Sequence, residues 1–184
     1  MGIPVPADVR DALQQALAAV DRDLGALRRS DPLGWHLTLA FVGELADERV
    51  PTLRTAVVDT LAAARPPRLG LTVDGAGRFG RRVLFGAITD RPDGTLARLG
   101  ATLQTTIERA GLPVERREVR PHVTVARSGR AAPVTEETVG ALQATLGARP
   151  PIRWTPRALA VYRATDREGP ARYSVDASVP LSVG

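Results

Sequence analysis

Two short stretches of this sequence share one pattern: Trp-His-Leu-Thr-Leu-Ala-Phe at residues 35–41 and Pro-His-Val-Thr-Val-Ala-Arg at residues 121–127. Each places a threonine two residues after a histidine, and together they contain both histidines of the chain. The alternation of polar and apolar residues predicts β-strands, because successive side chains of a strand point to opposite faces. We therefore expect the histidine and threonine of each stretch on one face, and the apolar side chains in the core.

If the two His/Thr faces meet at one cleft, their side chains could catalyse a reaction at a phosphate group. Two imidazoles can divide acid and base work at a phosphorus centre, because the unperturbed pKa of histidine, about 6.5, lies close to neutral pH. Threonine hydroxyls can donate hydrogen bonds to phosphate oxygens, where charge gathers in the transition state. His36 and His122 are thus candidate catalytic residues, and Thr38 and Thr124 candidate phosphate-binding residues. In the alternative interpretation, each histidine is an ordinary packed or surface residue.

Composition indicates how many domains the chain has and excludes some classes of protein. The chain has 184 residues, of which 43% are hydrophobic and 24% charged, so we expect a single domain over residues 1–184 with two small lobes. It contains no cysteine, which excludes disulfides and cysteine-based metal sites. Neither an apolar run of about 18–20 residues nor a signal sequence is present. We expect a cytoplasmic protein, by default a monomer, without a membrane span.

The basic residues of the chain are all arginines. There are 25 of them, no lysine, and a formal net charge of +5. Arginine is well shaped for bidentate phosphate binding, and a modest positive field favours an anionic substrate. The charge is too small and too dispersed to predict that the protein wraps a long nucleic-acid duplex. Because the sequence offers no histidine-rich metal cluster, we expect neither a metal nor a cofactor.

Periodicity predicts helices between strands. Apolar residues recurring every three or four positions predict helices from Asp8 to Arg29, from Asp47 to Arg65, from Asp93 to Gly111, and from Thr135 to Leu146. Besides the two motif strands, residue content predicts strands over residues 69–74, 82–89, 158–163 and 172–179, with a turn at Gly169 and Pro170 between the last two. Without a long βαβ series, this order predicts a bilobal α+β fold: two pseudo-symmetric antiparallel-sheet lobes with flanking helices and a central cleft carrying the two motif strands.

A glycine-rich segment, Asp-Gly-Ala-Gly-Arg-Phe-Gly, occupies residues 74–80. Such a segment could be a phosphate-binding loop, but it lacks both the Walker spacing and a terminal Lys-Ser/Thr pair. We therefore predict that it connects two antiparallel strands.

The two motifs and their flanks resemble those of the two-histidine (2H) phosphoesterase superfamily. Within it, they are most similar to the bacterial and archaeal RNA 2′,3′-cyclic phosphodiesterases, also called 2′-5′ RNA ligase-like proteins. The first motif runs into Phe-Val-Gly-Glu at residues 41–44, and the second lies between Pro121 and Arg127. Further similarities lie in the segment 75–79, the strand at 83–85, and the ending at Tyr173 and Pro180-Leu181. The resemblance covers nearly the whole chain.

This resemblance implies metal-independent hydrolysis of a 2′,3′-cyclic phosphate at an RNA end to a 2′-phosphomonoester, in a bilobal α+β fold. By similarity, His36 is the general acid that protonates the leaving O3′, and His122 is the general base that activates water. Thr38 and Thr124 hold the phosphate together with Arg127. The implied partner is RNA with a cyclic phosphate end or a small cyclic nucleotide, and ATP is not implied. The reverse reaction, which joins ends through a 2′-5′ bond, is expected in vitro. Which histidine is acid and which base stays open.

Two alternatives for the function stay open. One is a phosphodiesterase that acts on another cyclic phosphate or on a 2′-5′-linked nucleotide. The other is a non-catalytic module that binds RNA ends or nucleotides, for which His36→Ala changes affinity only. Phe79 is either a nucleobase contact or a packing residue, and Arg78 either contacts RNA or belongs to a solvated loop. We assign Tyr162 and Tyr173 to packing.

The start of the chain departs from the family pattern. Family members usually begin with a strand of the Arg-hydrophobic-Phe type, whereas residues 1–6 read Met-Gly-Ile-Pro-Val-Pro. The comparison predicts that most of this strand is absent. Either the natural chain begins further upstream, or the first sheet has one strand fewer and an exposed edge.

Overall fold

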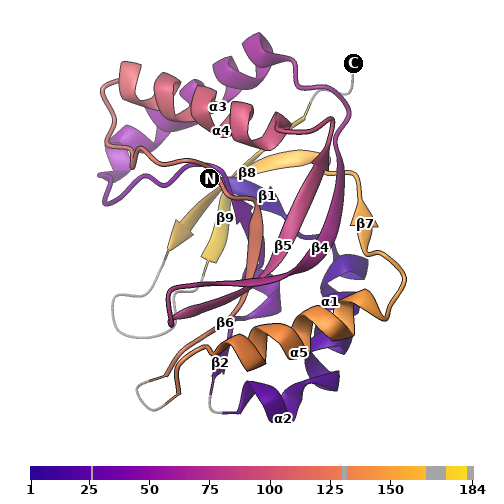
Figure 1. Ribbon diagram of the computed structural model, residues 1–184. Coiled ribbons are helices and arrows are strands. Elements are labelled where there is room, and N and C mark those ends of the chain that lie inside the picture. The colour runs from indigo at the N-terminus through magenta and orange to yellow at the C-terminus, as the bar shows by residue number, and fades with distance from the viewer. Residues whose placement is uncertain (26, 130–131, 165–172, 182–184) are drawn as a thin grey trace.

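In the computed structural model, the described strands form two antiparallel sheets, which lie between two groups of helices (Figure 1). The structure describes residues 1–25, 27–129, 132–164 and 173–181. Sheet A has the strand order β3-β1-β8-β9 and consists of β1 (Gly2–Pro4), β3 (His36–Thr38), β8 (Ala158–Ala164) and β9 (Tyr173–Pro180). Sheet B has the order β2-β6-β5-β4-β7 and consists of β2 (Arg28–Arg29), β4 (Gly70–Phe79), β5 (Val83–Arg91), β6 (His122–Arg127) and β7 (Arg153–Trp154). The expected α+β fold class is confirmed, with one motif strand in each sheet.

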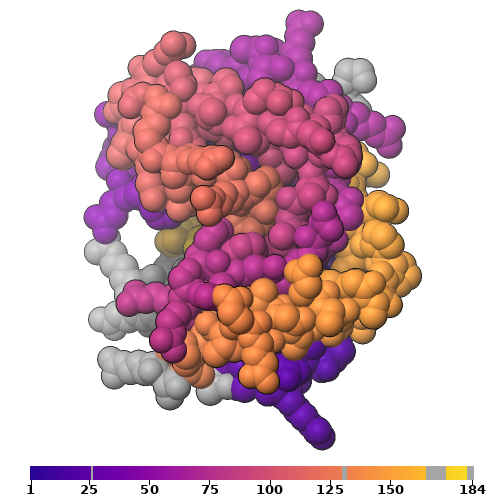
Figure 2. Space-filling view, in the orientation of Figure 1, coloured from indigo at the N-terminus to yellow at the C-terminus, as the bar shows by residue number. Residues whose placement is uncertain are grey.

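The helices lie in two groups at opposite ends of the molecule (Figure 1). One group comprises α1 (Ala7–Ala19), α2 (Asp21–Leu24) and α5 (Glu136–Gly147), and it packs on sheet B. The other comprises α3 (Val50–Ala64) and α4 (Thr95–Arg109), which pack against each other. Short 3₁₀ turns precede β3 (η1, Pro32–Gly34) and α3 (η2, Asp47–Arg49). In the space-filling view, α3 and α4 occupy the upper part of the visible face, and α5 crosses its lower part (Figure 2).

The first helix is shorter than its apolar periodicity predicts, while the other three predicted helices are confirmed. Helix α1 ends at Ala19, α2 adds one turn, and the chain leaves the helical conformation at Gly25, whose φ is +51°. Arg28 and Arg29 then pair with β6 instead of extending the helix. The helix prediction was wrong here because sheet B supplies backbone hydrogen-bond partners that the sequence pattern does not reveal.

The first strand is present, contrary to the expectation that most of it is absent. Strand β1 is short but central, because it pairs with β3 on one side and β8 on the other. A methyl group on Gly2 would lie 2.1 Å from the carbonyl oxygen of Leu37, so only glycine permits this close approach. In sheet A, β1 therefore lies between β3 and β8, and β3 lies at the edge.

The glycine-rich segment was wrongly predicted to be a connection. Strand β4 continues through it to Phe79, with a β-bulge between Val73 and Ala76, where Gly75 has a φ of +92°. Gly77 lies directly opposite Phe85 of β5, and the Phe85 ring fills the space beside it. Glycine does not end this strand, because a neighbouring aromatic side chain supplies the missing packing.

The apolar faces of the motif strands lie in the core, as their alternation predicts. Leu37, Leu39, Val123 and Val125 are at most 1% exposed. Each such side chain contributes about 1.5–3 kcal/mol on burial, which holds the polar side chains of both strands on the opposite face. No helix in the described part of the chain has both the length and the apolar character needed to cross a membrane. The predicted turn at residues 169–170 lies outside the described residues.

Candidate active site

His36 follows a tight turn that fixes its ring. The side chain of Asp31 accepts a hydrogen bond from the backbone N–H of Leu33 and so caps η1. The carbonyl oxygen of Gly34, the last residue of this turn, lies 2.8 Å from Nδ1 of His36. A carbonyl oxygen only accepts hydrogen bonds, so Nδ1 carries the proton. In the neutral ring, Nε2 is then the nitrogen with a free lone pair.

His122 is held in the same way. Its Nδ1 lies 2.6 Å from the carbonyl oxygen of Arg120, again two residues before the histidine. Both imidazoles therefore keep Nε2 for chemistry, and each is oriented by its own backbone rather than by a carboxylate. The sequence predicted the two histidines but not this shared hydrogen bond, which depends on the backbone conformation of the two preceding residues.

One cavity of about 1450 Å³ brings the two motif strands together. It is lined by His36 and Thr38 of sheet A and by His122 and Thr124 of sheet B. The two polar faces predicted from the alternation thus open into the same space, although they belong to different sheets.

Arg127 also lines this cavity, and a β-bulge places it there. Along β6, strict alternation would put Arg127 on the opposite face from His122 and Thr124. The register with β5 shifts at this point, so that Val125 is the extra residue between the pairs formed by Thr124 and Ala126. Two consecutive buried residues, Val125 and Ala126, then return Arg127 to the cavity side.

Two tyrosines surround His36. The ring of Tyr162 stacks on the imidazole at a centroid distance of 4.3 Å, and Tyr173 contacts it edge-on at 4.9 Å. Both tyrosines line the cavity, so their assignment to packing alone was incomplete. They come from β8 and β9, far from His36 in sequence, and no local pattern marks them. Burial raises the pKa of Tyr162 to about 12, so its hydroxyl stays protonated and can donate a hydrogen bond.

Two phenylalanines contact His122. Phe79 contacts its ring edge-on at a centroid distance of 4.8 Å, and Phe85 lies at 5.2 Å. The two phenylalanines also contact each other at 4.4 Å. Phe79 lines the cavity and packs against a candidate catalytic residue. Its contact with a nucleobase stays a prediction.

Burial lowers the pKa of both histidines below the ordinary value of 6.5. For His36, the hydrogen bond from Nδ1 to the backbone carbonyl opposes this effect, whereas the amino terminus and His122 add to it. For His122, a similar carbonyl contact opposes the effect, and the charges of Arg117 and Arg127 add to it. Both imidazoles are therefore mainly neutral at pH 7 while the cavity holds no anion. A bound phosphate would favour the imidazolium form and raise both pKa values.

Arg78 does not join this group. Its guanidinium pairs with Glu136 of α5 and donates to the carbonyl oxygen of Gly80, and it does not line the cavity. It alternates with Phe79 along β4, so the two neighbours lie on opposite faces of sheet B. Within the described ranges, no group of three or more His, Cys, Asp or Glu side chains is placed to hold a metal ion.

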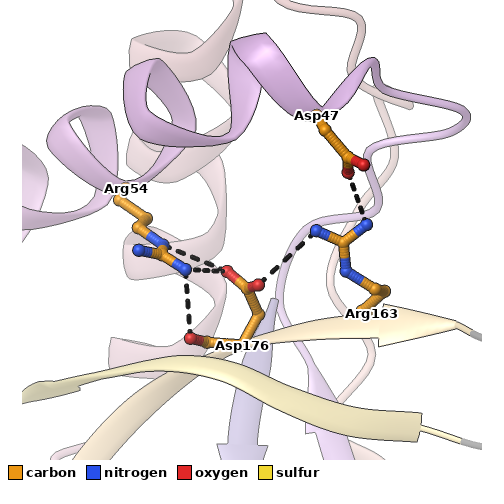
Figure 3. A network of polar contacts seen from close by, with 4 residues as sticks. All are labelled: Asp47, Arg54, Arg163 and Asp176. Atoms are coloured by element: carbon orange, nitrogen blue, oxygen red, sulfur yellow. Dashed lines mark hydrogen bonds and ion pairs between the residues drawn. The ribbon is translucent and has the colours of Figure 1, made fainter.

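A network of charged side chains connects the cavity wall to α3 (Figure 3). Asp176 of β9 accepts hydrogen bonds from Nε and Nη2 of Arg54 at 3.0 and 2.7 Å. Its other oxygen lies 3.6 Å from Arg163 of β8, which also donates to Asp47 at 2.6 Å. Arg163 and Asp176 line the cavity. The network therefore ties the two strands that carry the tyrosines to the start of α3.

Comparison with known proteins identifies the family. The sequence profile of the 2′-5′ RNA ligase superfamily matches residues 5–168. The chain is 31% identical to an RNA 2′,3′-cyclic phosphodiesterase of Escherichia coli (strain K12) over 132 residues, which is 71% of each protein. It is 25% identical to the Bacillus subtilis (strain 168) protein of the same name over 135 residues, 69% of each.

Solved structures agree with this result. The crystal structure of E. coli LigT complexed with 3′-AMP superposes with a TM-score of 0.72 at 25% identity, covering 98% of this chain and 95% of that one. The crystal structure of a Thermus thermophilus protein, TT0787, shows the same fold with a TM-score of 0.73 at 24% identity and the same coverage. The two-histidine resemblance of the sequence is thus confirmed, and the chain belongs to the 2′-5′ RNA ligase superfamily of 2H phosphoesterases.

Proposed function

We propose that this protein hydrolyses the 2′,3′-cyclic phosphate at an RNA end to a 2′-phosphomonoester, with His122 as general base and His36 as general acid. One observation carries the proposal: two imidazoles from different sheets line one cavity, each with Nδ1 held by a backbone carbonyl and a threonine two residues on. Such a pair can take a proton on one side of a phosphorus atom and give one on the other.

The proposed reaction has the following proton balance. Neutral His122 removes a proton from water through Nε2 while the water oxygen bonds to phosphorus. The bond from phosphorus to O3′ breaks, and protonated His36 gives its Nε2 proton to O3′. The products are a 2′-phosphate and a free 3′-hydroxyl, with His122 protonated and His36 neutral. Proton exchange with solvent restores the starting state.

The remaining polar groups of the cavity fit the charge that this reaction develops. Hydroxyls of Thr38 and Thr124 can donate to the non-bridging phosphate oxygens, and Arg127 can neutralise their charge. The substrate's own negative charge supports the protonated form of His36, which the empty cavity disfavours. The acid is thus charged mainly when substrate is bound.

The comparisons support a nucleotide substrate. Two relatives are named RNA 2′,3′-cyclic phosphodiesterase, and a related structure contains 3′-AMP, a nucleotide with a phosphate on its ribose. The rings of Tyr162 and Tyr173 beside His36 and of Phe79 beside His122 line the cavity and offer apolar surface for a base.

The test is hydrolysis of a 2′,3′-cyclic mononucleotide and of an RNA oligomer that ends in the same group, in the presence of EDTA. The wild type is compared with His36→Ala and His122→Ala, and the position of the phosphate in the product is assigned by NMR. We expect a 2′-phosphate and a loss of kcat of about 10²–10⁴-fold in each variant.

Three outcomes would contradict the proposal. Activity that disappears in EDTA would contradict the metal-independent step. A 3′-phosphate product would reverse the assignment of the leaving oxygen. Binding of both substrates without turnover would instead support the non-catalytic alternative, particularly if His36→Ala changed affinity only.

A further inference from the structure

We propose that Arg28 extends phosphate binding beyond the cavity, so that the protein prefers the end of an RNA chain over a cyclic mononucleotide. This inference rests on the proposed function and specifies its substrate. Arg28 lies in β2, the edge strand of sheet B next to the strand of His122. It is exposed and does not itself line the cavity.

The strand register places Arg28 in one row with cavity residues. Phe79 of β4 is paired with Val83 of β5, Val83 with Arg127 of β6, and Arg127 with Arg28 of β2. Residues directly opposite each other in an antiparallel sheet project from the same face. Since Phe79, Val83 and Arg127 line the cavity, Arg28 continues this wall outward by one strand spacing, about 4.8 Å.

The neighbouring arginine shows that the two sides of β2 differ. Arg29 projects from the opposite face, where it donates to the carbonyl oxygen of Leu17 and pairs with Asp21. Arg29 thus ties β2 to the helices that cover the back of sheet B. Arg28 has neither an ion pair nor a side-chain hydrogen bond within the described part of the chain. It projects from the cavity face of sheet B and has no partner there.

The pairing of Arg28 with Arg127 is electrostatically unfavourable unless an anion lies nearby. Two like charges directly opposite each other in a sheet repel, and Arg127 also has no acidic partner among the described residues. A polyanion bound across both side chains removes this repulsion. With the cyclic phosphate held beside Arg127, the adjacent phosphate of the same RNA strand is the group that Arg28 can reach, whereas a mononucleotide has no such phosphate.

The experiment compares Arg28→Gln with the matched variant Arg68→Gln. Arg68 is also exposed and has no partner in the described ranges, but it lies two residues before β4, whose first residue is about 30 Å along the strand from Phe79. For each protein, kcat/KM is measured on a 2′,3′-cyclic mononucleotide and on an RNA tetranucleotide with a 2′,3′-cyclic end, over a range of salt concentrations.

We expect the ratio of the tetranucleotide to the mononucleotide kcat/KM to fall about 5–10-fold in Arg28→Gln and to stay unchanged in Arg68→Gln. The slope of log kcat/KM against log salt for the tetranucleotide should become shallower by about 0.7 in Arg28→Gln, because one phosphate contact on a single strand is lost. An unchanged ratio, or an equal loss on both substrates, would overturn the role of Arg28.

If the protein is not a phosphodiesterase, the kinetic experiment gives a different result. A wild type that turns over neither substrate contradicts the phosphodiesterase proposal itself. The role of Arg28 is then decided by fluorescence anisotropy with a labelled RNA tetranucleotide that carries a 3′-phosphate. Weaker binding by Arg28→Gln than by Arg68→Gln supports the role, and equal binding overturns it.

Discussion

The two histidines share a motif and a hydrogen bond but not an environment. His36 lies on a three-residue strand at the edge of sheet A, stacked on Tyr162 and next to Tyr173. His122 lies on a strand inside sheet B and contacts Phe79 and Phe85, which also contact each other. Tyrosines add hydroxyl donors to the His36 side, whereas the His122 side combines apolar rings with arginine charge.

Under the proposed function, one repeated motif supports two different roles. The backbone carbonyl two residues earlier fixes the same tautomer in both rings, so the strand itself does not distinguish acid from base. Under the proposed function, the different surroundings of the two rings would make this distinction, by setting which protonation state each ring favours when the phosphate is bound.

The largest effect is expected from removing either histidine. The two variants should differ on a substrate whose leaving group departs without a proton, because such a leaving group needs no general acid. On a 2′,3′-cyclic nucleotide, His36→Ala and His122→Ala should each lower kcat about 10³-fold. On bis(p-nitrophenyl) phosphate, His36→Ala should come within about tenfold of the wild type, while His122→Ala keeps most of its loss. Steady-state kinetics on both substrates provide the measurement. The opposite pattern would exchange the two roles, and equal losses on both substrates would remove the division of labour.

A smaller effect is expected from Arg127→Gln. Loss of this charge beside the phosphate should lower kcat/KM by about 10–100-fold, and Arg68→Gln should not. Arg127 also helps to lower the pKa of His122, so its removal should raise that pKa.

The pH profile tests the second part of this prediction. A general base acts only above its pKa, so the acid limb of kcat/KM should lie below pH 6.5 in the wild type, where His122 has a lowered pKa, and move to higher pH in Arg127→Gln. NMR titration of the two histidines measures the pKa of His122 directly in both proteins. A shift of His36 rather than His122 would contradict the placement of Arg127.

Gly77→Ala should disturb the His122 side specifically. A Cβ at this position would lie 2.6 Å from Cζ of Phe85, so the ring must move against Phe79 or His122. Overpacking of this kind costs about 1–3 kcal/mol, and we expect kcat to fall about three- to tenfold. Thermal denaturation and kinetics measure the two effects.

The control for Gly77→Ala is Gly140→Ala in α5. Beyond the backbone of its own helix, nothing lies within 4 Å of a Cβ at Gly140, so this variant should be as stable as the wild type or more stable by up to about 1 kcal/mol. If Gly77→Ala behaved like the control, the Phe85 ring would not be constrained as the structure indicates.

The smallest effect is expected from Asp176→Asn, on the His36 side. The variant weakens the contacts to Arg54 and Arg163 that hold β8 and β9 against α3 (Figure 3). We expect a loss of about 1 kcal/mol in the free energy of unfolding. We also expect a two- to threefold loss of kcat/KM, because the strands that carry Tyr162 and Tyr173 are held less firmly in place.

The matched control is Asp93→Asn, which removes a surface ion pair with Arg91 in which both side chains are about three-quarters exposed. Its effect on stability should be close to zero. NMR titration should show a changed pKa for His36 and an unchanged one for His122 in Asp176→Asn. Equal behaviour of the two variants would mean that the network has no positioning role.

Much of the site was predictable from sequence because its signals are local. The alternation around His36 and His122 predicted two strands with polar and apolar faces, and burial of Leu37 and Val123 confirms it. The order of helices and strands predicted the α+β class. These predictions depend on residues two to four positions apart, a range over which backbone geometry alone relates side chains.

The remaining features depend on strand pairing between distant residues. Pairing with β6 turns Arg28 and Arg29 into a strand where periodicity predicts helix, and pairing with β5 carries β4 through Gly75 and Gly77. The bulge at Val125 brings Arg127 to the cavity against the alternation. None of these has a local signal, since the hydrogen-bond partner and the packing ring are supplied by another segment.

The local pattern was therefore enough to predict that the histidine and threonine of each motif strand face away from the core, because a two-residue period is a property of any extended chain. Long-range contacts set the rest: both polar faces open into one cavity, tyrosines contact one histidine and phenylalanines the other, and Arg28 continues the row of Arg127. These features have no local signal because register, bulges and ring contacts are set between residues far apart along the chain, where two strands or two sheets meet.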